Sequence, residues 1–405
     1  MGKTGAYSKV VKFDVFFSLS HIPAGGVLPS EAAMFRAFFS QVEAADRLGY
    51  STAWLAESHL STEVQKGNRR PVVPHFQGEV GLNADFCQLA HQVFSRTEHL
   101  ECGSAVMNIL CNGGPVAAAE RVATFAALHG CHEKESRRIH VGFSAGRFDF
   151  MNRAYGIDAR SEVEEAAWPA LKGKVFREAA HIFLRLLRGD TLSSDDTPET
   201  HLGRNDFRSE EDWQKVINAH GKKEASIFIP RRFVFEDLKI VPQEWRRELV
   251  VPVVGSHDPA LQLELNQISP VQVFNLSITK QAVIEQTHQR MKDGFHPDGG
   301  AWRREYMPRT VMVFIDESEV LARDRAGAAL AEYWKALEGT LDPAKVAAAT
   351  ENALCGTPQQ VAEQVSTRFH ADDRLMLWFD FHDHDCERVI RGMESFATDV
   401  APDFA

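Results

Sequence analysis

Short apolar runs alternate with longer amphipathic stretches along almost the whole chain, and this alternation restricts the fold more than any other feature. The runs have the length of buried strands, and the stretches between them carry apolar residues at helical spacing, as in residues 30–48. About eight strands are predicted, at residues 10–18, 52–57, 100–107, 138–144, 249–254, 271–274, 310–315 and 374–381. Eight strands that are each followed by a helix predict an α/β fold of the (β/α)8 TIM barrel type, with functional residues at the carboxyl ends of the strands. A doubly wound sheet is the competing architecture, but no G-x-G-x-x-G follows the first strand.

The regular alternation stops in two polar segments. Residues 61–83 and 190–247 show no sustained period, and the second is rich in Asp, Glu, Arg and Ser. We expect a single barrel domain over residues 1–405, with these segments as long insertions at the C-terminal face of the strands.

Composition favours small-molecule chemistry. The formal net charge of −11 argues against a surface for nucleic acid or for an anionic membrane, because both require clustered Lys and Arg. There is no uninterrupted apolar stretch of bilayer length, and we expect no signal peptide. The six cysteines lack C-x-x-C spacing, so neither a disulfide framework nor a zinc knuckle is indicated. We expect a cytoplasmic protein.

An acid and a histidine follow the second predicted strand. Glu57 ends an apolar run, where a carboxylate is unfavourable unless it is paired, so it is either a structural brace or a site residue. His59 shares its face if the strand continues, and a neighbouring carboxylate would help to hold it protonated. The alternative is a partly exposed loop histidine.

Two further strand ends carry groups suited to a cofactor. After the third strand, the amide of Asn108 can donate and accept at once, which suits the edge of a heterocycle. After the fifth, Gly255, Ser256 and His257 lead into a helix that begins with Pro259, and a small-residue turn at a helix N-terminus commonly holds a phosphate. Asp258 could equally be a plain N-cap without a ligand.

The eighth predicted strand places Met376, Trp378, Asp380 and His382 on one face, and its last two residues are polar where the barrel opens. The acids and histidines of residues 380–385 also suggest a metal site. Ligands so dense in sequence cannot all face one ion, however, so a solvated helix start is favoured and no metal is predicted.

The sequence GFSAG at residues 142–146 fits the G-x-S-x-G pattern of a hydrolase nucleophile elbow, with Ser144 as the nucleophile. The strand half of that motif is present, but no clean helical period follows Gly146. A serine hydrolase is therefore retained as an alternative of a different class.

Several stretches together resemble the bacterial luciferase-like flavin-dependent monooxygenases, a (β/α)8 family. They are ADRLGYSTAWLAE (45–57), RTEHLECGSAV (96–106), PV (115–116) with AERVA (119–123), the segment 142–158 that ends in YGID, GTPQQVA (356–362) and the closing residues 396–402. The likeness runs nearly end to end.

This resemblance implies a two-component enzyme. A separate flavin reductase would supply reduced FMN, and O2 would then oxygenate a small organic substrate. The resemblance places the flavin phosphate near Gly255, Ser256 and His257, and the isoalloxazine against Met107, Asn108 and Ser144, so that Ser144 lines the flavin region and is no nucleophile. It also implies a homodimer.

The chain departs from the family at its acid–base position. Luciferases carry Glu-His-His-Phe where this chain has Glu-Ser-His-Leu at residues 57–60, so Ser58 occupies the position of the catalytic histidine. We expect Glu57, His59 and His382 to be catalytic, with His384 as a further possible acid–base group. Two alternatives share the fold: a deazaflavin-dependent oxidoreductase, which would transfer hydride without O2, and a flavin-binding relative without activity. The sequence does not indicate the substrate.

Overall fold

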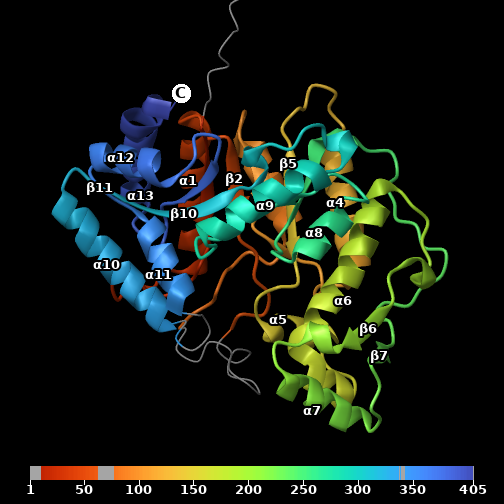
Figure 1. Cartoon of the computed structure of the whole chain (residues 1–405). Coiled ribbons are helices and arrows are strands. Elements are labelled where there is room, and N and C mark those ends of the chain that lie inside the picture. The colour runs from red at the N-terminus through yellow and green to blue at the C-terminus, as the bar shows by residue number, and fades with distance from the viewer. Residues whose placement is uncertain (1–10, 63–76, 337, 339–342, 405) are drawn as a thin grey trace, which may run out of the picture.

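The computed structural model describes residues 11–62, 77–336, 338 and 343–404, and at its centre lies a curled parallel sheet (Figure 1). The strands of this sheet are β1 (Lys12–Phe17), β2 (Thr52–Leu55), β3 (Glu101–Ser104), β4 (Met107–Asn108), β5 (Ile139–Ser144), β8 (Val250–Val254), β9 (Gln272–Val273), β10 (Arg309–Ile315), β11 (Leu354–Gly356) and β12 (Arg374–Trp378). Nine of them follow one another in the order β11-β10-β12-β1-β2-β3-β5-β8-β9, and β4 pairs with β5 beside this path.

The curl of the sheet brings the end of β9 to the start of β10. The Asn275 N–H donates to the Pro308 carbonyl at 2.9 Å, and the Thr310 N–H donates to the Asn275 carbonyl at 3.0 Å. These two bonds form an isolated parallel bridge between Asn275 and Arg309. All eight predicted strands are present, and the predicted α/β fold is confirmed as a curled parallel sheet with helices between its strands. β2 and β12 are shorter than predicted: they end at Leu55 and Trp378, so the expected strand faces do not extend to His59 or His382. The sequence missed β11, which pairs with β10 alone.

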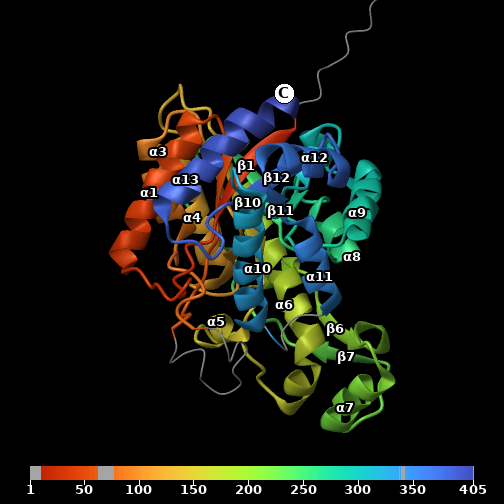
Figure 2. The ribbon, with the colours of Figure 1, turned by 90° about the vertical axis from the view of Figure 1, so that its left-hand side faces the viewer.

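Helices cover the outer face of the sheet. They are α1 (Glu31–Arg47), α3 (Phe86–Arg96), α4 (Gly114–His129), α6 (Glu162–Arg188), α8 (Pro259–Leu265), α9 (Gln281–Gly294), α10 (Glu319–Ala336), α11 (Pro343–Asn352), α12 (Pro358–Arg368) and α13 (Cys386–Ser395). The short helix α5 (Asp149–Arg153) lies instead at the foot of the molecule, beyond the end of β5. Serine caps begin two of the covering helices: Ser30 accepts from the Ala33 N–H and Ser161 from the Glu164 N–H, which satisfies donors that a helix start leaves free. The first and last helices, α1 and α13, lie side by side (Figure 2). In the part of the chain that the structure describes, no helix is both long and apolar enough to cross a membrane.

The polar segment 190–247 forms a small lobe of its own. It contains β6 (Thr200–Gly203), α7 (Glu210–His220) and β7 (Ser226–Ile229), and the two strands pair antiparallel. The lobe lies at the foot of the molecule in Figures 1 and 2, next to α6. Of the other predicted insertion, 61–83, residues 63–76 lie outside the described residues.

A buried ion pair joins the first strand to the last inside the curl of the sheet. Arg374 donates from Nε to Asp14 Oδ2 at 2.6 Å and from Nη2 to Thr52 Oγ1 at 2.6 Å. The Trp54 indole N–H donates to the same Asp14 oxygen at 2.7 Å. The two charged side chains are 4% and 0% exposed, and burial raises the pKa of the Asp14 carboxyl while Arg374 opposes that shift. The network therefore connects β1, β2 and β12.

Replacing Arg374 by Met should strongly destabilise the fold. The substitution leaves the Asp14 carboxylate buried with only the indole donor, and breaking a buried pair in this way costs roughly 3–5 kcal/mol. Urea denaturation followed by circular dichroism measures the loss. Arg391→Met is the matched control, because Arg391 and its partner Glu387 are 63% and 90% exposed. We expect a change within about 0.5 kcal/mol for that control. Equal losses in the two variants would contradict a special role for the buried pair.

Candidate active site

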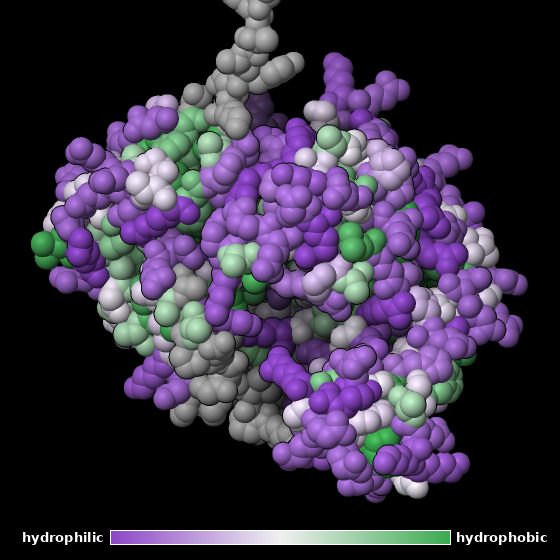
Figure 3. Space-filling model, viewed as in Figure 1, coloured by the Kyte–Doolittle hydropathy of each residue, from purple (hydrophilic) through white to green (hydrophobic). Residues whose placement is uncertain are grey.

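The side chains that the sequence singles out lie at or just after the ends of five strands. Because these strands are parallel, their carboxyl ends all lie at the same end of the sheet. Glu57 and His59 follow β2, Met107 and Asn108 form β4, Ser144 ends β5, Gly255 to His257 follow β8 and His382 follows β12. In the face drawn in Figure 3 the molecule is hollowed below α8 and α9. Because α8 begins directly after the Gly255 to His257 loop, this hollow lies next to the strand ends.

Glu57 braces the end of β2 and also positions a histidine. Its Oε2 accepts from the Phe86 N–H at 2.9 Å, at the start of α3, and its Oε1 accepts from the Asn108 N–H at 3.3 Å. The same Oε1 lies 3.0 Å from His59 Nε2, and the two side chains are 3% and 4% exposed. Of the two alternatives that the sequence left, the geometry shows the brace, because the carboxylate fixes the backbone at Phe86 and Asn108 and also contacts the His59 ring. The role as a site residue stays a prediction. His59 is buried, so the exposed loop histidine is ruled out.

Asn108 belongs to a pair of buried amides that close the strand end. Its Nδ2 donates to Asn152 Oδ1 at 2.7 Å, and its Oδ1 accepts from the Leu110 N–H at 3.0 Å. Asn152, from α5, in turn donates to the Ala145 carbonyl at 3.0 Å. Gly146 packs against this pair with a φ of +68°, and a Cβ there would lie 2.2 Å from Asn108 Nδ2. A side chain at position 146 would therefore displace Asn108.

Ser144 lies between Asn108 and Gly255. It pairs with Asn108 in the β4–β5 register, and a Cβ on Gly255 would lie 3.2 Å from the Ser144 Cβ and 3.3 Å from Val106 Cγ2. Glycine at 255 thus keeps the surface next to Val106 open. Hydrogen bonds and contacts connect Glu57, Asn108, Ser144 and Gly255 into one continuous rim.

An apolar floor lies inside this rim. Four partly buried side chains form this floor: Ala56, Ala105, Val106 and Trp378. They pack on a buried cluster that consists of Phe16, Trp54, Val253, Phe274 and Met376. The buried indole nitrogen of Trp378 makes no hydrogen bond of ordinary geometry in the described structure. Burial raises the pKa of the nearby Asp380 carboxyl, and the indole nitrogen opposes this shift. A flat apolar molecule with a polar edge would suit such a surface.

The turn after β8 is arranged differently from a simple helix-terminus anion site. Asp258 caps α8, because its side chain accepts from the N–H groups of Ala260 and Leu261 at 2.9 and 3.3 Å. These donors are therefore already satisfied, and Asp258 is confirmed as the N-cap of α8. The positive charge near the turn comes from Lys345 and Arg290, which lie on other helices. Burial lowers the pKa of His257, and these two cations lower it further.

The turn is also connected to Arg290 by hydrogen bonds. Gln262 donates to the Ser256 carbonyl at 2.7 Å and accepts from the Arg290 guanidinium. His257 Nε2 lies 3.1 Å from Asn275 Oδ1, so this nitrogen is the donor and the ring is held in one orientation. The sequence did not reveal Arg290 or Lys345, because each comes from a helix distant in the chain.

His382 and Asp380 lie near a different set of groups. His382 packs edge-on to Tyr333, and its Nδ1 is 3.5 Å from Glu332 Oε2. Burial lowers the pKa of His382, and Glu332 opposes this. Asp380 is two residues before it, and burial raises the pKa of its carboxyl to about 7, while a main-chain bond from Ser18 opposes the shift. A cavity of about 30 Å³, the size of one water molecule, adjoins Asp380 and is lined also by Ser18, Gln41 and His384.

Two alternative chemistries find little support in this geometry. Among the described side chains, no three His, Cys, Asp or Glu residues gather in a way that could hold a metal ion. The Ser144 hydroxyl accepts from the Gly146 N–H at 3.1 Å, and within the described residues no histidine is hydrogen-bonded to it. The helix after β5 begins only at Asp149, so the strand does not turn directly into a helix as a nucleophile elbow requires.

Comparisons with known proteins agree with the fold and identify the family. Among solved structures, the chain is similar to the monooxygenase RslO1 from Streptomyces bottropensis, with 17% identity and a TM-score of 0.69 over 98% of this chain and 100% of that chain. The oxygenating constituent of 3,6-diketocamphane monooxygenase from Pseudomonas putida, in complex with FMN, gives 13% identity and a TM-score of 0.60 over 97% and 98% of the two chains. An F420-dependent secondary alcohol dehydrogenase gives 12% identity and a TM-score of 0.56 over 98% and 99%.

At these identities the solved structures establish a shared fold. A comparison with curated proteins gave no match. The family model of the luciferase-like monooxygenases, however, matches residues 12–372, which is most of the chain. The chain therefore belongs to the luciferase-like monooxygenase family.

Proposed function

We propose that the protein is the oxygenating component of a two-component flavin-dependent monooxygenase, which binds reduced FMN at the carboxyl ends of the strands and uses O2 to oxygenate a small organic substrate. The observation that carries this proposal is the continuous rim of Glu57, Asn108, Ser144 and Gly255 around an apolar floor. Cations lie at one end of this rim and a buried acid–histidine pair at the other.

The residues present fit a flat cofactor with a phosphate tail. Glycine at 255 keeps open the surface beside Val106 that a Cβ would cover, and glycine at 146 allows the Asn108 amide to pack against the backbone. The Trp378 indole N–H, which lacks a well-formed hydrogen bond in the described structure, could serve a polar ring edge. Ser256 and His257, with Arg290 and Lys345 nearby, would hold the phosphate. Met107, Asn108 and Ser144 would lie along the ring. Bound reduced flavin would supply the electrons that activate O2.

The remaining polar groups would control protons and water. Glu57 fixes His59 by a 3.0 Å contact, so His59 would hold or deliver a proton at Nε2. Asp380, with a pKa of about 7, and His382 would act similarly from the β12 side. The apolar floor would exclude water from the oxygen chemistry. A separate flavin reductase, a homodimer and a cytoplasmic location complete the proposal, and they rest on the resemblance to the family.

A deazaflavin-dependent oxidoreductase is the second candidate function. The observation that favours it is the similar fold of the F420-dependent alcohol dehydrogenase, which covers the chain almost completely. Such an enzyme would transfer hydride and would not need O2. Cofactor binding separates this candidate from the monooxygenase directly.

Anaerobic titration with reduced FMN, in parallel with the reduced deazaflavin, should show tighter binding of reduced FMN. Rapid mixing of the FMN complex with oxygenated buffer should then give a transient absorbance in the near ultraviolet, because the apolar floor would exclude water from the reacting cofactor. Ser256→Ala and Asn108→Ala should weaken binding and shorten the transient. Binding of the deazaflavin alone would overturn the proposal in favour of the second candidate.

Gly146→Ala should weaken cofactor binding about tenfold and lower thermal stability, because its Cβ would collide with the Asn108 amide. Gly156→Ala is a matched control. Its φ of +76° imposes the same backbone strain, yet a Cβ there meets no atom within 4 Å. The control should therefore lose stability only and keep its affinity for reduced FMN, as calorimetry and titration can measure. Equal affinity in the two variants would show that Asn108 does not border the cofactor.

Asp380→Asn should change how stability depends on pH. The folded protein holds the Asp380 proton up to a pKa of about 7, whereas the unfolded chain releases it near the ordinary value of 3.8. The folded state thus binds more protons between these values, so wild-type stability falls relative to the variant as the pH rises from 4 to 7, and the difference levels off above 8. Melting temperatures of the two proteins across this range test the shift. A constant difference would contradict it.

A further inference from the structure

A large cavity lies at the amino ends of the strands, on the opposite face from the candidate active site. Its volume is about 520 Å³, which is within the range of small-molecule sites. Residues at or just before the starts of β5, β8, β9 and β10 line it, among them Arg138, Val250, Gln272 and Tyr306. In a parallel sheet, all amino ends of the strands lie at one end of the sheet and all carboxyl ends at the other. A ligand in this cavity would therefore not enter the proposed cofactor site.

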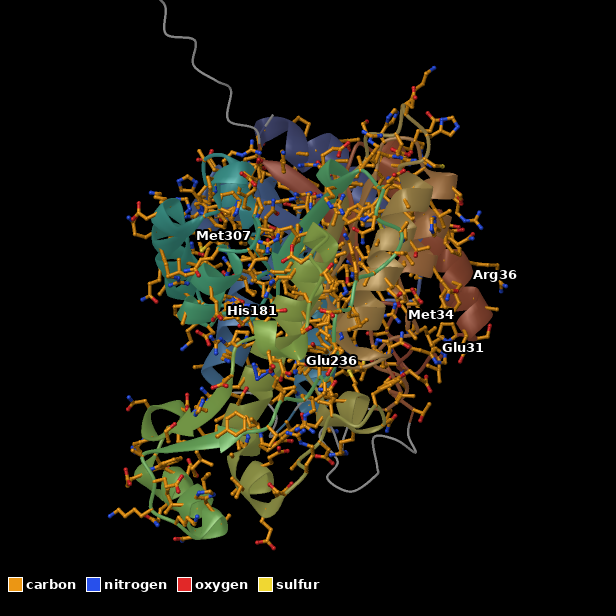
Figure 4. The ribbon with its side chains drawn as sticks, turned by 90° about the vertical axis from the view of Figure 1, so that its right-hand side faces the viewer. Glu31, Met34, Arg36, His181, Glu236 and Met307 are labelled. Carbon is orange, nitrogen blue, oxygen red and sulfur yellow. The ribbon has the colours of Figure 1, made fainter. Side chains whose placement is uncertain are left out.

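The walls of the cavity are apolar and aromatic. Leu184 and Leu187 at the end of α6 form one side, and Trp245, Phe295 and Tyr306 contribute rings. Figure 4 shows the side of the molecule on which these elements lie, with His181 labelled on α6 and Met307 labelled directly after Tyr306. Such walls favour a ring-bearing ligand over a highly polar one.

Two buried polar atoms in the lining lack partners. Gln272 is 6% exposed, and its Oε1 has no hydrogen-bond partner within the described residues; the same holds for Ser269 Oγ. An unpaired buried acceptor is costly, and a hydrogen bond from a ligand would satisfy it. The amide oxygen can only accept, so the complementary ligand atom is an N–H or O–H donor.

Two carboxylates also line the cavity: Glu248, which pairs with Arg246, and Asp298, which lies 3.8 Å from His296. Of the three arginines in the lining, Arg247 alone has no acidic partner in the described structure. It lies over the Trp245 ring at 4.7 Å and donates to the main-chain carbonyls of Leu187 and Gln243. No carboxylate pairs with it among residues 11–62, 77–336, 338 and 343–404, whereas Arg138 and Arg188 pair with Glu101 and Asp190. An anionic group on the ligand would be attracted to the Arg247 guanidinium.

We propose that this cavity is a second small-molecule site, which binds an aromatic acid that carries a hydrogen-bond donor beside its ring. The ring packs against Trp245, Phe295 and Tyr306, the donor meets Gln272 Oε1, and the acid faces Arg247. The site is independent of the cofactor and of the proposed oxygenation. Its position at the foot of β8 and β9 also places it on the strands that carry the Gly255 turn and Asn275 at their other ends.

The probe is 8-anilinonaphthalene-1-sulfonate, which combines fused rings, an amine N–H and one sulfonate. Its fluorescence is titrated with the full chain, with and without saturating FMN. We expect one class of binding that FMN does not displace. Gln272→Leu should weaken binding roughly three- to tenfold while leaving thermal stability unchanged or higher, because it removes an unsatisfied acceptor.

Charge and shape are tested separately. Arg247→Gln should weaken binding about fivefold. The control Arg391→Gln should not change it, because Arg391 is 63% exposed and neither it nor its partner Glu387 lines the cavity. Ser269→Phe should abolish binding by filling the space. Displacement of the dye by FMN, or unchanged affinity in Gln272→Leu, Arg247→Gln and Ser269→Phe, would overturn the proposal. Since no flavin chemistry enters this test, its failure would leave the proposed function untouched.

Discussion

The ion pair between Asp14 and Arg374 is the interaction on which the rest of the structure depends. These residues lie 360 positions apart in the chain, yet their side chains meet inside the curled sheet and are almost fully buried. Burying two charges is favourable only when both are fully hydrogen-bonded, and Thr52 and Trp54 on β2 supply the remaining bonds. The network thereby fixes the first, second and last strands relative to one another, and Glu57 and His382 follow two of these strands.

This arrangement divides the interior of the sheet into a polar and an apolar layer. Arg374 and Asp14 lie toward the amino ends of their strands, and farther along the same strands Phe16, Met376 and Trp378 are apolar. The charges are therefore kept away from the carboxyl ends, where the floor of the candidate site lies. A floor without charge is what water-sensitive oxygen chemistry requires, so the position of the ion pair has a direct consequence for the proposed function.

The sequence was sufficient for the strands and for the local part of the site. The eight main strands were predictable because each is a short apolar run. Glu57 and His59 do meet, but β2 ends at Leu55, so the shared strand face on which that expectation rested is not the cause. The side chains that contact Asn108 or lie near the Ser256 turn could not be predicted. Asn152, Arg290 and Lys345 lie on helices whose positions depend on tertiary packing. β11, α5 and α11 were missed because such short elements carry little periodicity. The helix-terminus phosphate prediction at Ser256 was modified by Asp258, whose side chain competes for the same N–H groups.

The motif at residues 45–57 shows how a family signature can be structural. Asp46 accepts from the N–H groups of Glu98, His99 and Leu100 at 2.8, 2.9 and 2.7 Å, which fixes the entry to β3. Tyr50 donates to the Met393 carbonyl at 2.8 Å and attaches α13 to the base of β2. Only the last residue of the motif, Glu57, reaches the candidate site. Under the proposed function, the acid–base chemistry would depend on the two residues after the motif, where Ser58 stands at the position of the family's histidine and a buried His59 lies beside the Glu57 carboxylate.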